Sequence, residues 1–359
     1  MTRILLMETG SFKVIGGAAK ETYALYKRLT RDSYHIDLLG AYKKIDSNAV
    51  TVDVGSAMER DYDIVWMNSI RDVPIADRYR RSHSKSKFIF VDRGNIISNF
   101  IGEGIKALHP KSVARRLLAN SLRGWLDCYV AISIEQLPAA RSFFSSRTAI
   151  KYIPIAPHEE YRVLRMHKAF SGGISVSRLD ERQKRISFMI KGIVRLRHLY
   201  PEIGNKRVLK IVGTGVDDGR YKSLAQSLGV SKNISFEGFK TGDELIRQYN
   251  DAGFFVSTSI WESFGRSLLE AMACGLPALI NNDINTVVSE KPKRSLVRNG
   301  LNGMIYDSCD IDDFAKKFHM LYSNERLRRK MSSNALSFIS GFSFSKVVRD
   351  YEKLLDSMA

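Results

Sequence analysis

Two glutamates, Glu262 and Glu270, stand out because the residues between them include a glycine-containing turn and the predicted start of a helix. Seven residues separate them, and the strand-like run 254–257 precedes both. This order predicts a strand, a turn and a helix, with Glu262 before the helix and Glu270 two turns inside it. A strand-to-helix turn in a parallel sheet lies at the carboxyl edge, where ligands bind.

The turn itself has the chemistry of an anion site. The first backbone amides of a helix have no partner within the helix and attract negative charge. Gly265 lets the backbone approach a phosphate closely. The candidate binding residues of this turn are Ser263, Phe264, Gly265, Arg266 and Ser267. The alternative, a glutamate pair on a solvated helix face, accounts for none of this turn chemistry.

A second constellation, Ser175–Arg185, also begins as a strand and continues as a basic loop. Arg178 can bind a diphosphate in a bidentate manner and Lys184 can act as a point charge. Taken alone, this loop reads as a solvated basic segment. Together with the Glu262 segment, it predicts a diphosphate clamp that uses Arg178 and Lys184.

Two glycine pairs follow predicted strands. Gly213 and Gly215 come after the run 208–212, and Gly16 and Gly17 come after the run 4–7. A short glycine motif permits a tight turn as readily as it admits a ligand, so both interpretations stay open.

The segment Glu262–Pro277 resembles the Glu-x7-Glu signature of family-4 retaining glycosyltransferases, which have the GT-B fold. The match includes Glu-Ser-Phe-Gly and Leu-Glu-Ala-Met-Ala-Cys-Gly-Leu-Pro. The resemblance covers about residues 170–345. It implies that Glu262 holds the donor sugar and Glu270 the ribose, while Arg178 and Lys184 neutralise the leaving diphosphate. It also places the Gly213 and Gly16 loops near the nucleotide and its phosphates.

The implied reaction is transfer of a hexosyl unit, with retention, from a UDP- or GDP-linked sugar to a hydroxyl of a glycan or lipid-linked acceptor. No metal and no cofactor are expected. The acidic pairs Asp61/Asp63 and Asp310/Asp312 do not follow strands as metal-binding pairs do. Asp310 instead reads as a helix N-cap.

One position departs from the family pattern. Many members have a His-Gly pair after a strand of the first domain, and that histidine contacts the donor sugar. Here the corresponding residues are Val91 to Asn95, so Asp92, Arg93 and Asn95 become the candidate sugar contacts. The departure keeps a second hypothesis open, a catalytically silent nucleotide-sugar-binding protein. An epimerase or phosphorylase of the same fold is a further alternative.

The elements that must position these residues alternate along the chain. Strand-like runs separated by helical stretches occur in two successive sets, which predicts an α/β protein with parallel sheets. We expect a GT-B architecture of two Rossmann-like, doubly wound domains facing a cleft. The expected divisions are 1–165 for acceptor binding, 166–342 for the nucleotide sugar, and 343–359 as a helix returning to the first domain.

The composition of the chain excludes several classes of protein. The 359 residues carry a formal charge of +18 and three scattered cysteines, so a disulfide framework is disfavoured. No apolar run approaches the ~20 residues of a membrane helix. A cytoplasmic protein is expected. The basic amphipathic stretch 106–125 is read either as a helix covering the sheet or as a contact with the inner, anionic membrane face. Nucleic acid is not expected, because no binding motif accompanies the charge.

Overall fold

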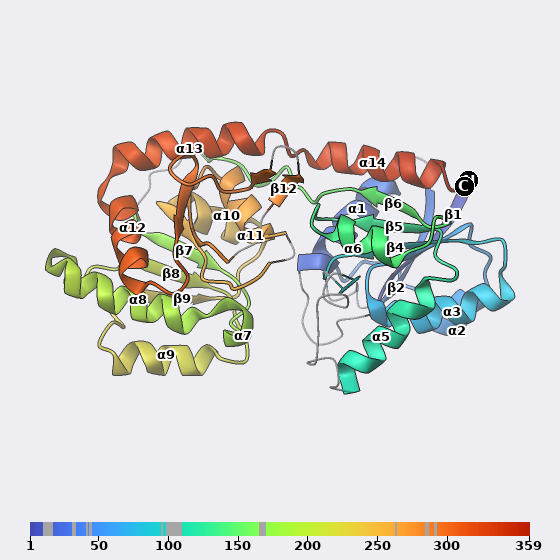
Figure 1. The fold of residues 1–359 in the computed structure, drawn as a ribbon, viewed down its shortest axis with the longest axis horizontal. Coiled ribbons are helices and arrows are strands. Elements are labelled where there is room, and N and C mark those ends of the chain that lie inside the picture. Colours follow the sequence, from blue (N-terminus) through green and yellow to red (C-terminus); the bar gives the residue numbers. More distant parts are fainter. Residues whose placement is uncertain are drawn as a thin grey trace. The chain divides into compact units, whose positions relative to one another are not determined.

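The computed structural model describes residues 1–9, 17–30, 34–40, 42, 45–94, 96–97, 110–164, 170–262, 264–283, 287–290 and 293–359. The chain forms two compact units, which are drawn in Figure 1. The first contains Met1–Ile155 together with Ser345–Ala359, and the second contains Ala156–Phe344. Each unit is built on its own six-stranded parallel sheet.

The first unit has the strand order β2-β1-β3-β4-β5-β6. Its strands are β1 (Thr2–Glu8), β2 (Tyr34–Gly40), β3 (Ile64–Met67), β4 (Lys87–Asp92), β5 (Cys128–Ala131) and β6 (Ala149–Tyr152). Its α-helices are α1 (Gly17–Leu29), α2 (Val54–Met58), α3 (Val73–Ser82), α5 (Pro110–Leu122) and α6 (Gln136–Phe143). The central strands are buried along their whole length, as strands covered on both faces must be.

A helix that follows the second unit in the sequence also belongs to this first unit. Helix α14 (Phe344–Asp356) places Tyr351 against Trp66 of β3, with ring centroids 4.7 Å apart. The Tyr34 hydroxyl donates to the Asp356 carboxylate over 2.5 Å. Both rings of the Trp66–Tyr351 pair are almost fully buried, so the helix is part of the core of the unit.

The second unit has the strand order β14-β11-β10-β7-β8-β9, the order of a Rossmann fold. Its strands are β7 (Gly173–Val176), β8 (Leu209–Val212), β9 (Ile234–Gly238), β10 (Phe254–Val256), β11 (Ala278–Asn281) and β14 (Gly303–Tyr306). Its α-helices are α7 (Glu181–Lys184), α8 (Ile186–Leu199), α9 (Asp218–Ser227), α10 (Gly242–Asp251), α11 (Arg266–Ala273), α12 (Ile311–Ser323) and α13 (Glu325–Ile339). The apolar faces of α8 and α12 pack on this sheet.

Several elements were not expected from the sequence. Strands β6 and β14 extend the two sheets at their edges, and β12 (Val287–Glu290) pairs with β13 (Lys293–Ser295) as a separate antiparallel ribbon. The strand-like runs that were expected all form strands. Asp310 caps α12 by accepting from the amides of Asp312 and Asp313, as predicted.

Helix α5, which forms most of the basic amphipathic stretch, has one buried face and one exposed face. Leu122 and the following Leu126 are buried, and Leu118 packs on the core of the first unit. Val113 and Leu117 instead face outward, and Leu117 is 66% exposed. The covering role therefore applies to part of the stretch only. Over the described residues, no helix is long and apolar enough to cross a membrane.

Candidate active site

The site predicted from the two loops lies at the switch point of the second sheet. The chain leaves β7 toward β8 on one side, whereas β10 pairs with β7 on the other. Open α/β sheets bind ligands where neighbouring strands send their connections in opposite directions. The loops after β7 and β10 carry Arg178, Lys184 and Glu262, so sequence-distant residues converge at this point.

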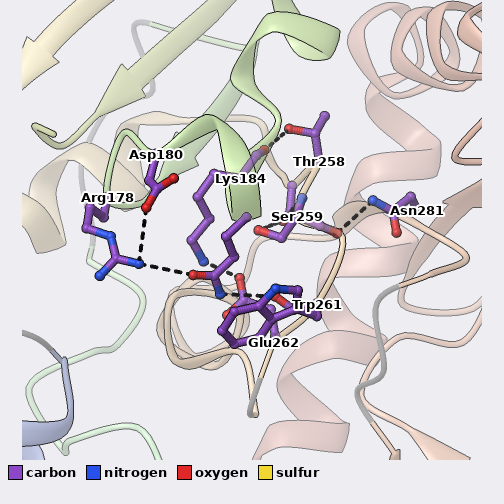
Figure 2. A network of polar contacts seen from close by, with 10 residues as sticks. Arg178, Asp180, Lys184, Thr258, Ser259, Trp261, Glu262 and Asn281 are labelled. Carbon is purple, nitrogen blue, oxygen red and sulfur yellow. Dashed lines mark hydrogen bonds and ion pairs between the residues drawn. The ribbon is translucent and has the colours of Figure 1, made fainter. Parts of the chain in front are cut away.

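The loop after β7 is shaped by Asp180. Its carboxylate accepts from the Arg182 amide over 3.1 Å and caps the short helix α7. This turn presents Arg178 and Lys184 on the same side, toward the loop after β10 (Figure 2). Arg178 is half-exposed and donates to the Gln183 side chain over 3.1 Å. It therefore keeps solvent access while its guanidinium is oriented.

The loop after β10 is bound to this turn along its length. The Thr258 hydroxyl donates to the carbonyl of Lys184 over 2.6 Å, and the Ile260 amide donates to the carbonyl of Gln183 over 2.9 Å. The Gln183 amide group in turn donates to the carbonyl of Trp261 over 3.1 Å. Gln183 thus links both loops to Arg178 and fixes their separation.

The centre of the network is an ion pair between Lys184 Nζ and Glu262 Oε1 (Figure 2). Both side chains are mostly buried, with 12% and 18% of their surface exposed. A pair shielded from water is stronger than a surface pair, and the loss of either partner leaves a costly charge. The structure therefore joins two of the predicted catalytic residues directly.

The glycines after β8 allow that strand's loop to lie against the Arg178 turn. Gly213 has φ +137°, and a Cβ there would lie 1.9 Å from the carbonyl oxygen of Ser177. A Cβ on Gly215 would lie 2.2 Å from the Leu179 oxygen. The Leu179 amide also donates to the Thr214 oxygen over 3.0 Å. The structural role is thus established for both glycines, and binding of a nucleotide there remains a prediction.

Helix α11 begins at Arg266, after Gly265 in a left-handed conformation with φ +88°. Its first amides, including that of Ser267, are the predicted anion site. Glu270 is the fifth residue of the helix, so it lies about one turn inside rather than the expected two. The Tyr249 hydroxyl donates to its Oε2 over 3.1 Å, and the carboxylate is buried.

The first-unit candidates have a different setting. Asp92 is fully buried and accepts from the amides of Gly94, Ile96 and Ile97 and from the Tyr129 hydroxyl. Its carboxylate holds the chain after β4. Arg93 donates through Nε to Asn68 over 3.1 Å. Gly17 opens helix α1.

Three further predicted residues, Gly16, Asn95 and Ser263, lie outside the described residues. Phe264, beside Ser263, is buried.

Sequence reasoning missed Gln183, Thr258 and Tyr249. Each is a neutral polar residue without a characteristic spacing, and each acts through contacts that form only when separate elements pack. Gln183 lies within the Ser175–Arg185 segment that was singled out, whereas Thr258 follows the run 254–257 and was not part of a predicted motif. Nothing in the sequence connects Tyr249 on α10 with Glu270 on α11.

Comparison with known proteins gives a family match for the second unit of the chain. Residues 173–338 match the family described as glycosyl transferases group 1. The matched segment is nearly the whole of the second unit and includes every loop of the Lys184–Glu262 network. The general glycosyltransferase family is therefore supported.

Curated relatives point to the same family. The chain is 30% identical over 173 residues to a D-inositol 3-phosphate glycosyltransferase of Thermobifida fusca, covering 47% of this chain and 38% of that protein. It is 24% identical over 245 residues to the putative glycosyltransferase EpsD of Bacillus subtilis, covering 64% of this chain and 60% of that protein. The chain thus spans about 38% and 60% of these two relatives.

Solved structures extend the similarity to the whole chain at the level of fold. A sucrose-phosphate synthase of Thermosynechococcus elongatus superposes with a TM-score of 0.78 and 15% identity, covering 100% of this chain and 99% of that chain. HepE of Anabaena, in complex with UDP and glucose, gives 0.78 and 17% over 99% and 100%. The expected two-domain α/β GT-B fold is confirmed.

Proposed function

We propose that this chain transfers a hexosyl unit from a nucleoside-diphosphate sugar, UDP- or GDP-linked, to a hydroxyl of a glycan or lipid-linked acceptor, with retention and without a metal. The observation that carries the proposal is the Lys184–Glu262 pair at the switch point, beside the half-exposed Arg178. The glycosyl transferases group 1 match over the same loops supports it.

The proposed roles follow from the charges and their exposure. Arg178 and the amides at the start of α11 bind the diphosphate, and Lys184 adds a second positive charge as the leaving group departs. Glu262, held by Lys184, accepts hydrogen bonds from hydroxyls of the donor sugar. Glu270, fixed by Tyr249, does the same for the ribose.

The direct test uses two neighbouring arginines. Arg178→Ala removes the proposed diphosphate ligand, whereas Arg182→Ala removes a cation that is 90% exposed on the same turn. Loss of a charge-assisted contact of about 1.5–3 kcal/mol predicts roughly ten- to hundredfold weaker binding of UDP or GDP in Arg178→Ala alone. Titration calorimetry of the full chain, without metal and then with it, measures this. Equal effects of the two substitutions would remove Arg178 from the site.

A second test separates transfer from binding. Glu262→Ala is expected to abolish sugar transfer while the folded chain still binds the nucleoside diphosphate. Transfer is followed by release of that diphosphate in the presence and absence of acceptor. A wild-type chain that binds a nucleotide sugar but neither transfers nor hydrolyses it is instead the silent binding protein that the Arg93 departure keeps open.

A further inference from the structure

The charged groups of Lys184 and Glu262 have only each other as partners within the described part of the chain. Lys184 Nζ contacts Glu262 Oε1, and neither group makes a second hydrogen bond or ion pair there. The exposed fractions of the two side chains, 12% and 18%, leave little room for water to replace the lost partner. Each charge therefore depends on the other, because a mostly buried charge without a partner is costly.

The charges around this pair are balanced. The charged side chains labelled in Figure 2 are Arg178 and Lys184, which are cations, and Asp180 and Glu262, which are carboxylates. Arg178 Nη2 lies 3.8 Å from Asp180 Oδ2 and donates to the Gln183 side chain. An incoming diphosphate thus meets no net positive charge from these side chains while Lys184 remains on Glu262.

Binding of the diphosphate changes the situation of Glu262. In the proposed function, on which this inference rests, Lys184 adds positive charge to the diphosphate and Glu262 accepts hydrogen bonds from the donor sugar. When Lys184 turns to the phosphates, the Glu262 carboxylate loses its partner and lies close to a second anion. Both effects raise the free energy of the complex. Hydroxyl groups of a sugar can restore the missing hydrogen bonds, because each hydroxyl is a donor.

We propose that the Lys184–Glu262 pair makes the site reject a nucleoside diphosphate that carries no sugar. An intact nucleotide sugar replaces both halves of the pair, since its diphosphate takes Lys184 and its hydroxyls take Glu262. A nucleoside diphosphate alone replaces only the first half. A site with a buried group that needs a substrate hydroxyl discriminates against the analogue that lacks it. The pair therefore also favours release of the nucleoside diphosphate after the sugar has been transferred.

The test is titration calorimetry of the full chain with UDP, GDP and inorganic pyrophosphate. Glu262→Gln keeps the shape and the hydrogen-bond acceptor of the side chain but has no charge to hold Lys184. We expect UDP or GDP, and pyrophosphate, to bind about tenfold more tightly to this variant than to the wild type. UDP-glucose or GDP-mannose should gain no affinity. The matched control is Glu325→Gln, which removes the carboxylate of an exposed pair with Arg329 and should leave every affinity unchanged.

A second background tests whether Lys184 is the group that changes partner. In Lys184→Met there is no cation to release, so adding Glu262→Gln should tighten nucleotide binding by less than about threefold. An equal gain on both backgrounds would show that Glu262 only repels the anion, and would overturn the exchange of Lys184. Glu262→Asp gives an independent measurement if the glutamine variant does not fold. It withdraws the carboxylate from Lys184 by one methylene group, so a smaller gain in the same direction is expected.

The outcomes separate this inference from the proposed function. A wild type that binds UDP or GDP with an affinity that Glu262→Gln and Glu262→Asp leave unchanged overturns the inference alone. Equal gains for the nucleoside diphosphate and the nucleotide sugar do the same, because the pair would then not discriminate. A wild type and variants that bind neither nucleotide nor nucleotide sugar overturn the proposed function and the inference with it.

Discussion

Lys184 and Glu262 are 78 positions apart and form an ion pair between the loops that follow two neighbouring strands. Two independently recognised segments therefore meet through their charged side chains. The side chains of Gln183 and Thr258 also donate hydrogen bonds to backbone carbonyls of the facing loop, so the two loops are joined through the backbone as well.

The strength of this pair can be measured with a double-mutant cycle of Lys184→Met and Glu262→Gln. Because both side chains are mostly buried, we expect a coupling energy of about 1–3 kcal/mol in the free energy of unfolding. The exposed helical pair Glu325–Arg329 is the control and should give about 0.3–0.5 kcal/mol. Urea unfolding of the wild type and the six variants tests both values, and similar coupling energies would show that burial does not strengthen the pair.

Glu8 makes stability depend on pH. Its pKa is raised from 4.5 to about 7 in the folded chain, so the native state prefers the protonated form. The penalty is absent well below pH 4.5, grows between 4.5 and 7, and is complete above about 7, where it reaches about 3 kcal/mol. Glu8→Gln should therefore raise the free energy of unfolding by about 3 kcal/mol at pH 8 and by less than about 1 kcal/mol at pH 5.

The matched control for that prediction is Glu59→Gln, which alters an exposed glutamate of the same unit. It should change the free energy of unfolding by less than about 0.5 kcal/mol at both pH values. A Glu8→Gln protein that is destabilised at pH 8 would contradict a costly, unpartnered carboxylate.

Gly213→Ala should distort the Arg178 turn. A Cβ at φ +137° would meet the backbone oxygen of Ser177, so we expect a loss of at least about 2 kcal/mol in the free energy of unfolding. Gly219→Ala, in helix α9 with open space around it, should be neutral or stabilising by up to about 1 kcal/mol. Denaturant unfolding of both variants makes the comparison. Equal stability would show that the close approach has no energetic role.

Leu117 tests the membrane hypothesis. It faces outward from α5 together with Val113, one turn earlier, and the helix also carries the exposed Arg115. A basic helix with an apolar outer side favours anionic lipid. We expect cosedimentation with phosphatidylglycerol-containing vesicles, reduced several-fold in Leu117→Ser, and none with neutral phosphatidylcholine vesicles. Leu301→Ser, on the second unit, is the control and should behave as the wild type. Undiminished sedimentation of Leu117→Ser would rule out this helix as the contact.

Much of the fold follows from local pattern. Runs such as Ile64–Met67 and Phe254–Val256 are continuously apolar and bounded by polar residues, which is how a strand buried on both faces reads. Strands at the sheet edges lack that pattern. Residues of β6 alternate between exposed and half-exposed, and β14 starts with a glycine, so neither resembles a core strand.

The residues of the candidate site that could be predicted are those whose chemical type and spacing in the sequence together form a motif. Arg178, Lys184, Glu262 and Gly265 all lie in turns that the sequence marks. The hydrogen-bond partners of the site residues were not predictable. Gln183 and Tyr249 contact the site only because elements that are distant in the sequence pack together. The same applies to Glu8, the last residue of β1, and Tyr42, which follows β2, because only the strand order brings these two polar residues to one edge of the sheet.

The stacking of Tyr351 on Trp66 has a consequence for biosynthesis. Because Ser345–Ala359 belongs to the first unit, that unit emerges from the ribosome with the indole of Trp66 uncovered while the entire second unit is still being made. The second unit, Ala156–Phe344, is contiguous and can fold as soon as it is synthesised. The amino-terminal unit is thus begun before the second unit and receives helix α14 only after the second unit has been synthesised.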